Sequence, residues 1–95
     1  MPSLKDWSIV NDSGDNFPNK RMKLTGKIYL SEIFKDGVEV ITSPIQSFTY
    51  ILDGQALTSN GTNYYLGMPS KKWMDWLREN KLEIKDYEGI NWLQN

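Results

Sequence analysis

The chain has 95 residues, a net charge of −1, 13% aromatic residues, and neither cysteine nor histidine. This length fits one domain, residues 1–95, and the charge argues against nucleic acid as a partner. Without cysteine and histidine the chain has no disulfide, no thiolate chemistry and none of the usual zinc ligands. Carboxylates alone could still hold a hard cation, but the twelve acidic residues are scattered and match no calcium loop, so we expect neither a metal nor a cofactor.

The N-terminal residues contain no apolar stretch of the kind that forms a signal peptide. No run approaches the roughly 20 apolar residues of a membrane-spanning helix. We therefore expect a cytoplasmic protein that does not contact the membrane.

The first third of the chain predicts two strands separated by a loop. Residues 4–10 form the first strand, and turn-forming residues fill 11–20. Apolar and polar residues alternate in the second strand, 23–30, where Leu24, Gly26, Ile28 and Leu30 share one face.

Three turn signals punctuate the middle of the chain: Asp36-Gly37, Asp53-Gly54 and Asn60-Gly61. Such pairs tolerate the positive φ angles of tight hairpins. They separate strands predicted at 38–42, 45–52, 55–58 and 62–66, so residues 4–66 read as an antiparallel meander.

The last third predicts a helix over 70–80 with Ser70 as its N-cap. Trp73, Trp76 and Leu77 give this helix one apolar face. Residues 81–95, which include Tyr87 and Trp92, form either a docked tail or a partner-binding tail. The whole pattern predicts a mainly β fold, a small meander rolled into an SH3-like, partly open barrel that a C-terminal helix closes.

The predicted strands have apolar residues on both faces. The expected core residues are Leu24, Ile28, Leu30, Val38, Val40, Phe48, Tyr50, Leu52, Tyr64 and Leu66. The opposite face carries Tyr29, Ile41, Ile51 and Tyr65. We expect the helix to cover these four residues; the alternative is that they meet a partner or a second copy of the chain.

No grouping of residues indicates catalysis, because no histidine is present to activate a nucleophile. The catalytic alternative is a hydrolase that uses paired carboxylates, which their spacing in the sequence does not identify. Ser70, Lys71 and Lys72 could hold an anion at the start of the helix, where free N–H groups point outward. The simpler interpretation is an ordinary capped helix whose lysines pair with Asp75. A basic cluster (Lys20, Arg21, Lys23, Lys27) is typical of a solvated strand edge.

Several motifs resemble a set of small uncharacterised bacterial and phage proteins. They are Leu24-x-Gly26, Asp36-Gly37, Thr42-Ser43-x-Ile45 and Thr58-x-x-Gly61-Thr62-x-Tyr64-x-Leu66-Gly67. These are turn and strand motifs, so the resemblance implies a shared fold and carries no functional site. It also implies a bacterial or phage origin, where small chains often inhibit a larger host protein.

We therefore expect a non-enzymatic protein that acts through protein–protein contact. The expected contact residues are Tyr29, Ile41, Ile51, Tyr65, Tyr87 and Trp92. The chain could also form a homodimer through the same residues. The alternative function is a nucleotide-binding or nucleic-acid-binding module that uses Ser70, Lys71, Lys72 and nearby tyrosines.

Overall fold

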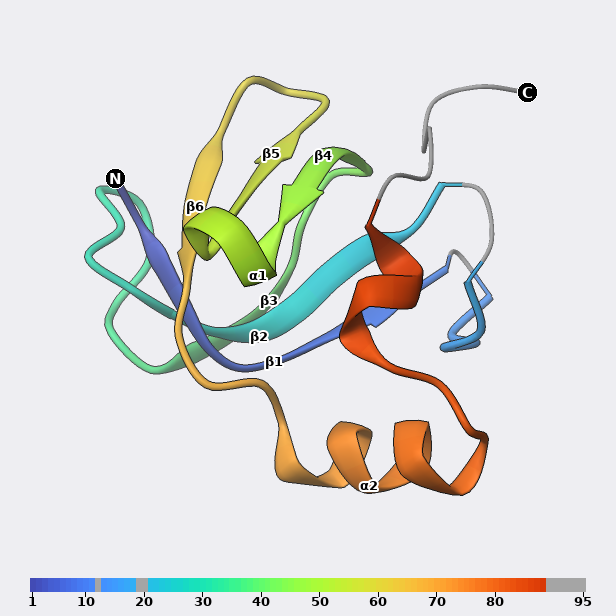
Figure 1. Ribbon diagram of the computed structural model, residues 1–95. Helices are drawn as coiled ribbons and strands as arrows, with labels where there is room; N and C mark the ends of the chain where they lie inside the picture. Colours follow the sequence, from blue (N-terminus) through green and yellow to red (C-terminus); the bar gives the residue numbers. More distant parts are fainter. Residues whose placement is uncertain (12, 19–20, 89–95) are drawn as a thin grey trace.

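The computed structural model describes residues 1–11, 13–18 and 21–88, apart from the side chain of Leu52. Strands dominate this part of the chain, which confirms the prediction of a mainly β protein (Figure 1). The elements are β1 (Ser3–Val10), β2 (Lys23–Tyr29), β3 (Val38–Ile41), β4 (Ile45–Thr49), α1 (Tyr50–Asp53), β5 (Gln55–Thr58), β6 (Asn63–Leu66), α2 (Lys71–Glu79) and the 3-10 helix η1 (Ile84–Tyr87).

The strands form one sheet in the order β3-β2-β1-β6-β5-β4. β1, β2 and β3 pair antiparallel, and so do β4, β5 and β6. β1 and β6 join the two sets and run parallel, with Ser3 opposite Tyr65. The sheet is therefore mixed, and the expectation of one continuous antiparallel meander is wrong at this central pair.

The sheet is strongly curled, because three residues connect its two outermost strands. In a flat six-stranded sheet those strands would lie about 24 Å apart, whereas the step from Ile41 to Ile45 spans at most about 14 Å. Thr42 N–H donates to the Leu24 carbonyl and Ile45 N–H to the Met22 carbonyl, both at 2.8 Å. β3 and β4 form no ladder within the described residues, so the sheet is not closed and the SH3-like barrel is not confirmed.

The strand predicted at 45–52 ends early. β4 stops at Thr49, and Tyr50–Asp53 form the short helix α1. Gly54 ends this helix with φ +62°, and its N–H donates to the Tyr50 carbonyl at 2.9 Å. Glycine with positive φ occurs both at the C-termini of helices and in hairpin turns. The Asp53-Gly54 pair was therefore interpreted as a hairpin turn, although it ends a helix.

Trp7 lies at the centre of the core and is fully buried. Its ring packs against Phe48, Tyr50 and Trp73 at centroid distances of 5.8, 5.1 and 5.4 Å. Its indole N–H donates to the Gly67 carbonyl at 2.8 Å. Aromatic pairs at such distances stabilise a core beyond the area that they bury.

The apolar side of α2 packs into this same core. Trp73 and Leu77 are buried, and the Trp73 ring lies 5.5 Å from that of Tyr87. The expectation that the helix covers the opposite face of the sheet is therefore wrong. The Trp7 ring lies on the core face, 5.4 Å from that of Trp73, so Trp73 buries its apolar surface there among other apolar side chains.

Candidate functional site

Tyr29 and Tyr65 share the outer face of the sheet. Ser3 pairs with Tyr29 on one side and with Tyr65 on the other, so the three side chains form one row across β2, β1 and β6. Tyr65 is exposed and Tyr29 is half-buried. The Lys5 ammonium lies 4.8 Å from the centre of the Tyr29 ring, a distance typical of a cation–π contact.

The other two residues of the predicted stripe lie elsewhere. Ile41 ends β3 opposite Thr25. Ile51 lies on α1, and its N–H donates to Glu88 Oε1 at 2.9 Å. The four side chains therefore do not form one continuous stripe, because α1 replaces the predicted strand that would have carried Ile51.

The loop between β2 and β3 exposes three apolar side chains that sequence reasoning did not select. Leu30 is 72% exposed, Ile33 is 86% exposed, and Phe34 is also exposed. Leu30 was expected in the core, but β2 ends at Tyr29 and Leu30 adopts φ +61°. This left-handed conformation turns the chain out of the strand.

Polar side chains within the loop hold this conformation. Asp36 Oδ1 accepts the N–H of Leu30 at 2.9 Å. Ser31 Oγ accepts the N–H groups of Ile33 and Phe34, each at 3.1 Å. These hydrogen bonds fix the conformation of the loop within the chain itself.

These residues surround a hollow of about 420 Å³ at the open end of the sheet. The N-terminus lies beside the loop there (Figure 1), and Ile41 lines the same hollow with 69% of its surface exposed. We call the exposed apolar side chains at this place the loop patch. Its members are Met1, Leu30, Ile33, Phe34 and Ile41.

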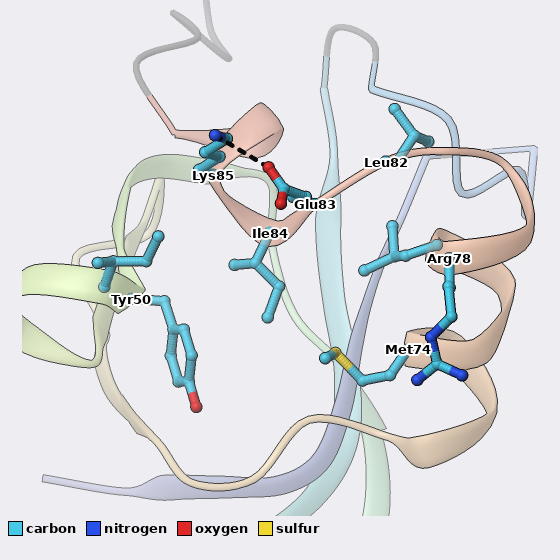
Figure 2. A pocket seen from close by; sticks show the side chains of 9 residues that line it. Tyr50, Met74, Arg78, Leu82, Glu83, Ile84 and Lys85 are labelled. Atoms are coloured by element: carbon cyan, nitrogen blue, oxygen red, sulfur yellow. Dashed lines mark ion pairs between the residues drawn. The ribbon is translucent and has the colours of Figure 1, made fainter.

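A second hollow, of about 470 Å³, lies between α1, α2 and the segment that leads into η1. Figure 2 shows the side chains of Tyr50, Met74 and Ile84 around this space. Arg78 and Lys85 also line it, but each has a carboxylate partner: Arg78 pairs with Asp75 at 3.5 Å, and Lys85 with Glu83 at 3.0 Å.

The start of α2 has the predicted cap. Ser70 Oγ accepts the N–H of Trp73 at 3.3 Å, which satisfies one free donor of the first turn. Lys71 and Lys72 are exposed. The expected pairing of these lysines with Asp75 is wrong, since Asp75 pairs with Arg78. Ser70 and Lys72 also line a smaller hollow of about 250 Å³, beside Trp73 and Trp76.

Tyr87 is fully buried, so its assignment to a partner-binding surface is corrected. Its hydroxyl donates to the Asn16 carbonyl. Burial, together with the negative charges of Asp86 and Asp15, raises the pKa of Tyr87 well above its ordinary value. The first part of the predicted tail is thus docked on the core, while Trp92 lies outside the described residues.

Comparisons with protein-family models, with curated proteins and with solved structures found no match to this chain. None of the helices in residues 1–11, 13–18 and 21–88 is long and apolar enough to cross a membrane.

One signal in the sequence indicated the loop patch. Ser31 follows the end of a strand, and Asp36-Gly37 precedes the next strand. Serine and aspartate bind nearby backbone N–H groups and so favour turns. Apolar residues between Ser31 and Asp36 cannot continue the alternation of a strand. The sequence therefore indicates that Ile33 and Phe34 belong to a loop and not to the sheet.

Proposed function

We propose that this protein is a non-enzymatic binding protein that acts by occupying a surface of another protein. The observation that supports this proposal is the loop patch, where exposed apolar side chains gather around one hollow. Single exposed apolar side chains are common on soluble proteins, but a contiguous group is typical of an interaction site.

The ordered loop adds to this argument. Leu30 keeps a left-handed backbone conformation that is unfavourable for a residue with a Cβ atom. The Asp36 carboxylate accepts the N–H of Leu30, and the Ser31 hydroxyl accepts those of Ile33 and Phe34. These bonds hold the loop in a conformation that directs its apolar side chains toward solvent. Such an arrangement does not serve folding, because these side chains bury little area.

Affinity capture with three forms of the chain tests the proposal. The wild type, immobilised and exposed to a bacterial lysate, should retain a protein that mass spectrometry identifies. The double variant Ile33→Ser/Phe34→Ser should lose it. The matched control is Met68→Ser, which removes an exposed apolar side chain away from the loop patch and should keep the partner.

Two results would contradict the proposal. One is that no protein is retained by the wild type above the background of the bare matrix. The other is that the same protein is retained equally by the wild type and by Ile33→Ser/Phe34→Ser. Circular dichroism of all forms checks that each variant is folded.

A second candidate function is small-anion binding at the start of α2. The hollow beside Ser70 and Lys72 favours it, because aromatic rings, a hydroxyl and an ammonium group line one space. A nucleotide bound there would raise the melting temperature by mass action, and Lys71→Glu/Lys72→Glu would abolish that rise. If millimolar nucleotides leave the melting temperature of the wild type unchanged, this candidate is removed.

A further inference from the structure

The two outermost strands of the sheet present different edges. β4 has a register shift between Ile45 and Ser47 and runs directly into α1. β3 pairs with β2 through four consecutive residue pairs without irregularity. Bulges and bends hinder pairing with another chain, so β4 is protected in a way that β3 is not.

The free edge of β3 consists of the backbone groups of Glu39 and Ile41. Thr42 N–H donates to the Leu24 carbonyl on β2 at 2.8 Å. Residues of an antiparallel pair alternate between facing the neighbouring strand and facing away from it. Glu39 and Ile41 therefore turn their N–H and C=O groups outward, where an added strand would meet them.

The side chains along this edge suit such a strand. Val38 and Ile41 are exposed on β3 itself. The loop patch adjoins the same strand, because Gly37 and Val38 follow directly on the ordered loop and Ile41 belongs to the patch. An added strand could thus pair with β3 and bury apolar side chains against Ile33 and Phe34.

The loop and β3, residues 30–41, carry three acidic side chains (Glu32, Asp36, Glu39) and one basic side chain (Lys35), all exposed, so their net charge is negative. Glu32 and Glu39 are both exposed, and neither forms an ion pair with a residue in the described part of the chain. Lys27 lies opposite Glu39, but its ammonium group lies 3.6 Å from Asp6. A partner that carries lysine or arginine would therefore complement this surface.

We propose that β3 receives an extended, basic segment of another protein as an added strand, with alternate apolar side chains of that segment on the loop patch. This inference rests on the proposed protein-binding function and names how the partner binds. In strand addition, main-chain hydrogen bonds supply affinity and alternate side chains supply specificity.

A second copy of this chain is a poorer occupant than a foreign segment. A pair of chains joined through β3 would bring Glu32 and Glu39 of each chain to one interface, and like charges oppose such pairing. The strand is also only four residues long. Stable dimers bury about 1,200–2,000 Å² in total, which so short a pairing does not reach.

Selection from a library of short random peptides tests the inference on the whole chain. Enriched peptides should alternate apolar and polar residues and carry lysine or arginine. At saturation, a bound peptide should slow hydrogen exchange at the Glu39 and Ile41 amides by about tenfold or more. N-methylation of alternate peptide residues should abolish binding, because it removes the donors that pair with β3.

A charge reversal sharpens the test. Glu39→Lys should weaken the selected basic peptides by about tenfold, as expected for a lost charge pair at an interface. Glu79→Lys is the matched control, since Glu79 is exposed on α2 and away from this edge, and it should bind like the wild type.

Other results would overturn the inference. Peptides with apolar residues at helical spacing that bind the loop patch, without protecting Glu39 and Ile41, exclude strand addition and leave the protein-binding function intact. Protection of the same two amides on raising the protein concentration alone identifies a second copy as the occupant. If no peptide distinguishes the wild type from Ile33→Ser/Phe34→Ser, strand addition at this edge is wrong, while the capture experiment still tests the function.

Discussion

Large apolar side chains gather in two regions of this molecule, and only one of the two is covered. The first region is the part of the core that α2 covers, here called the helix end. There Trp7, Trp73 and Tyr87 pack against one another and are buried. At the loop patch, Leu30 and Ile33 are exposed on a loop that polar side chains hold in place. Under the proposed function, the helix end provides stability and the loop patch provides binding, so substitutions in the two regions should differ in what they change.

The largest loss of stability should come from Trp7→Ala. Trp7 is fully buried at the centre of the aromatic cluster. Removing a buried tryptophan ring typically costs about 3–5 kcal/mol, a large part of the stability of a small domain. Urea unfolding measures the change. A loss below about 1 kcal/mol would mean that the helix end does not provide most of the stability.

Gly26→Ala should also destabilise, by about 1–3 kcal/mol. A Cβ atom at Gly26 would lie 3.0 Å from the Lys5 carbonyl oxygen and from both Cα and Cβ of Trp7. The backbone of β1 must move away to accept it, and this movement disturbs the position of the Trp7 ring. Gly67→Ala is a useful comparison, because its φ is not positive and its Cβ would lie 3.3 Å from the Leu4 carbonyl oxygen and from Lys5 Cγ, so it should cost less than Gly26→Ala. Equal losses of stability in the two variants would indicate that the close approach to Trp7 is unimportant.

Tyr87 should make stability fall at alkaline pH. Burial and the charges of Asp86 and Asp15 raise its pKa above the ordinary value of 10.0. Above that pH the unfolded chain loses the phenolic proton while the folded chain keeps it, so stability declines as pH rises, by about 1.4 kcal/mol per unit.

Tyr87→Phe should remove this contribution and flatten the alkaline slope. It should also lower stability at neutral pH by about 1 kcal/mol, because the hydrogen bond to the Asn16 carbonyl is lost. Unfolding free energies measured across the alkaline range give the slope. Tyr65→Phe, on the exposed outer face, is the control. If the wild type and Tyr87→Phe lose stability equally as the pH rises, burial does not raise the pKa of Tyr87.

Local signals in the sequence predicted most of the elements. The alternation of apolar and polar residues predicted β2 and β3. The Asn60-Gly61 pair predicted the turn before β6, and Ser70 predicted the start of α2. These features depend on neighbouring residues, so a single sequence contains them. The exception is α1, because the glycine that ends it has the same positive φ as a hairpin glycine.

Long-range relations were beyond the reach of the sequence. The parallel pairing of β1 with β6 joins residues about sixty positions apart, and no local pattern specifies it. The face of the sheet on which α2 packs could not be predicted, because it depends on the burial of Trp7. Sequence analysis assigned Trp7 to a strand but not to the core. Tyr87 was assigned to a surface for the same reason, since its partners Trp73 and Asn16 are distant in the chain.

The smallest expected change in stability, and the most informative about the comparison, is that of Leu30→Asn. Leu30 has φ +61° and is exposed, so its side chain contributes little to folding while its backbone conformation is unfavourable. Asparagine tolerates this conformation better than leucine, and the substitution should raise stability by up to about 1 kcal/mol. It should also weaken partner binding, because it removes an apolar side chain from the loop patch. Urea unfolding and binding of the captured partner or a selected peptide measure the two effects. A variant that is both less stable and equally competent in binding would show that Leu30 serves the fold, and the division between the two regions would then be wrong.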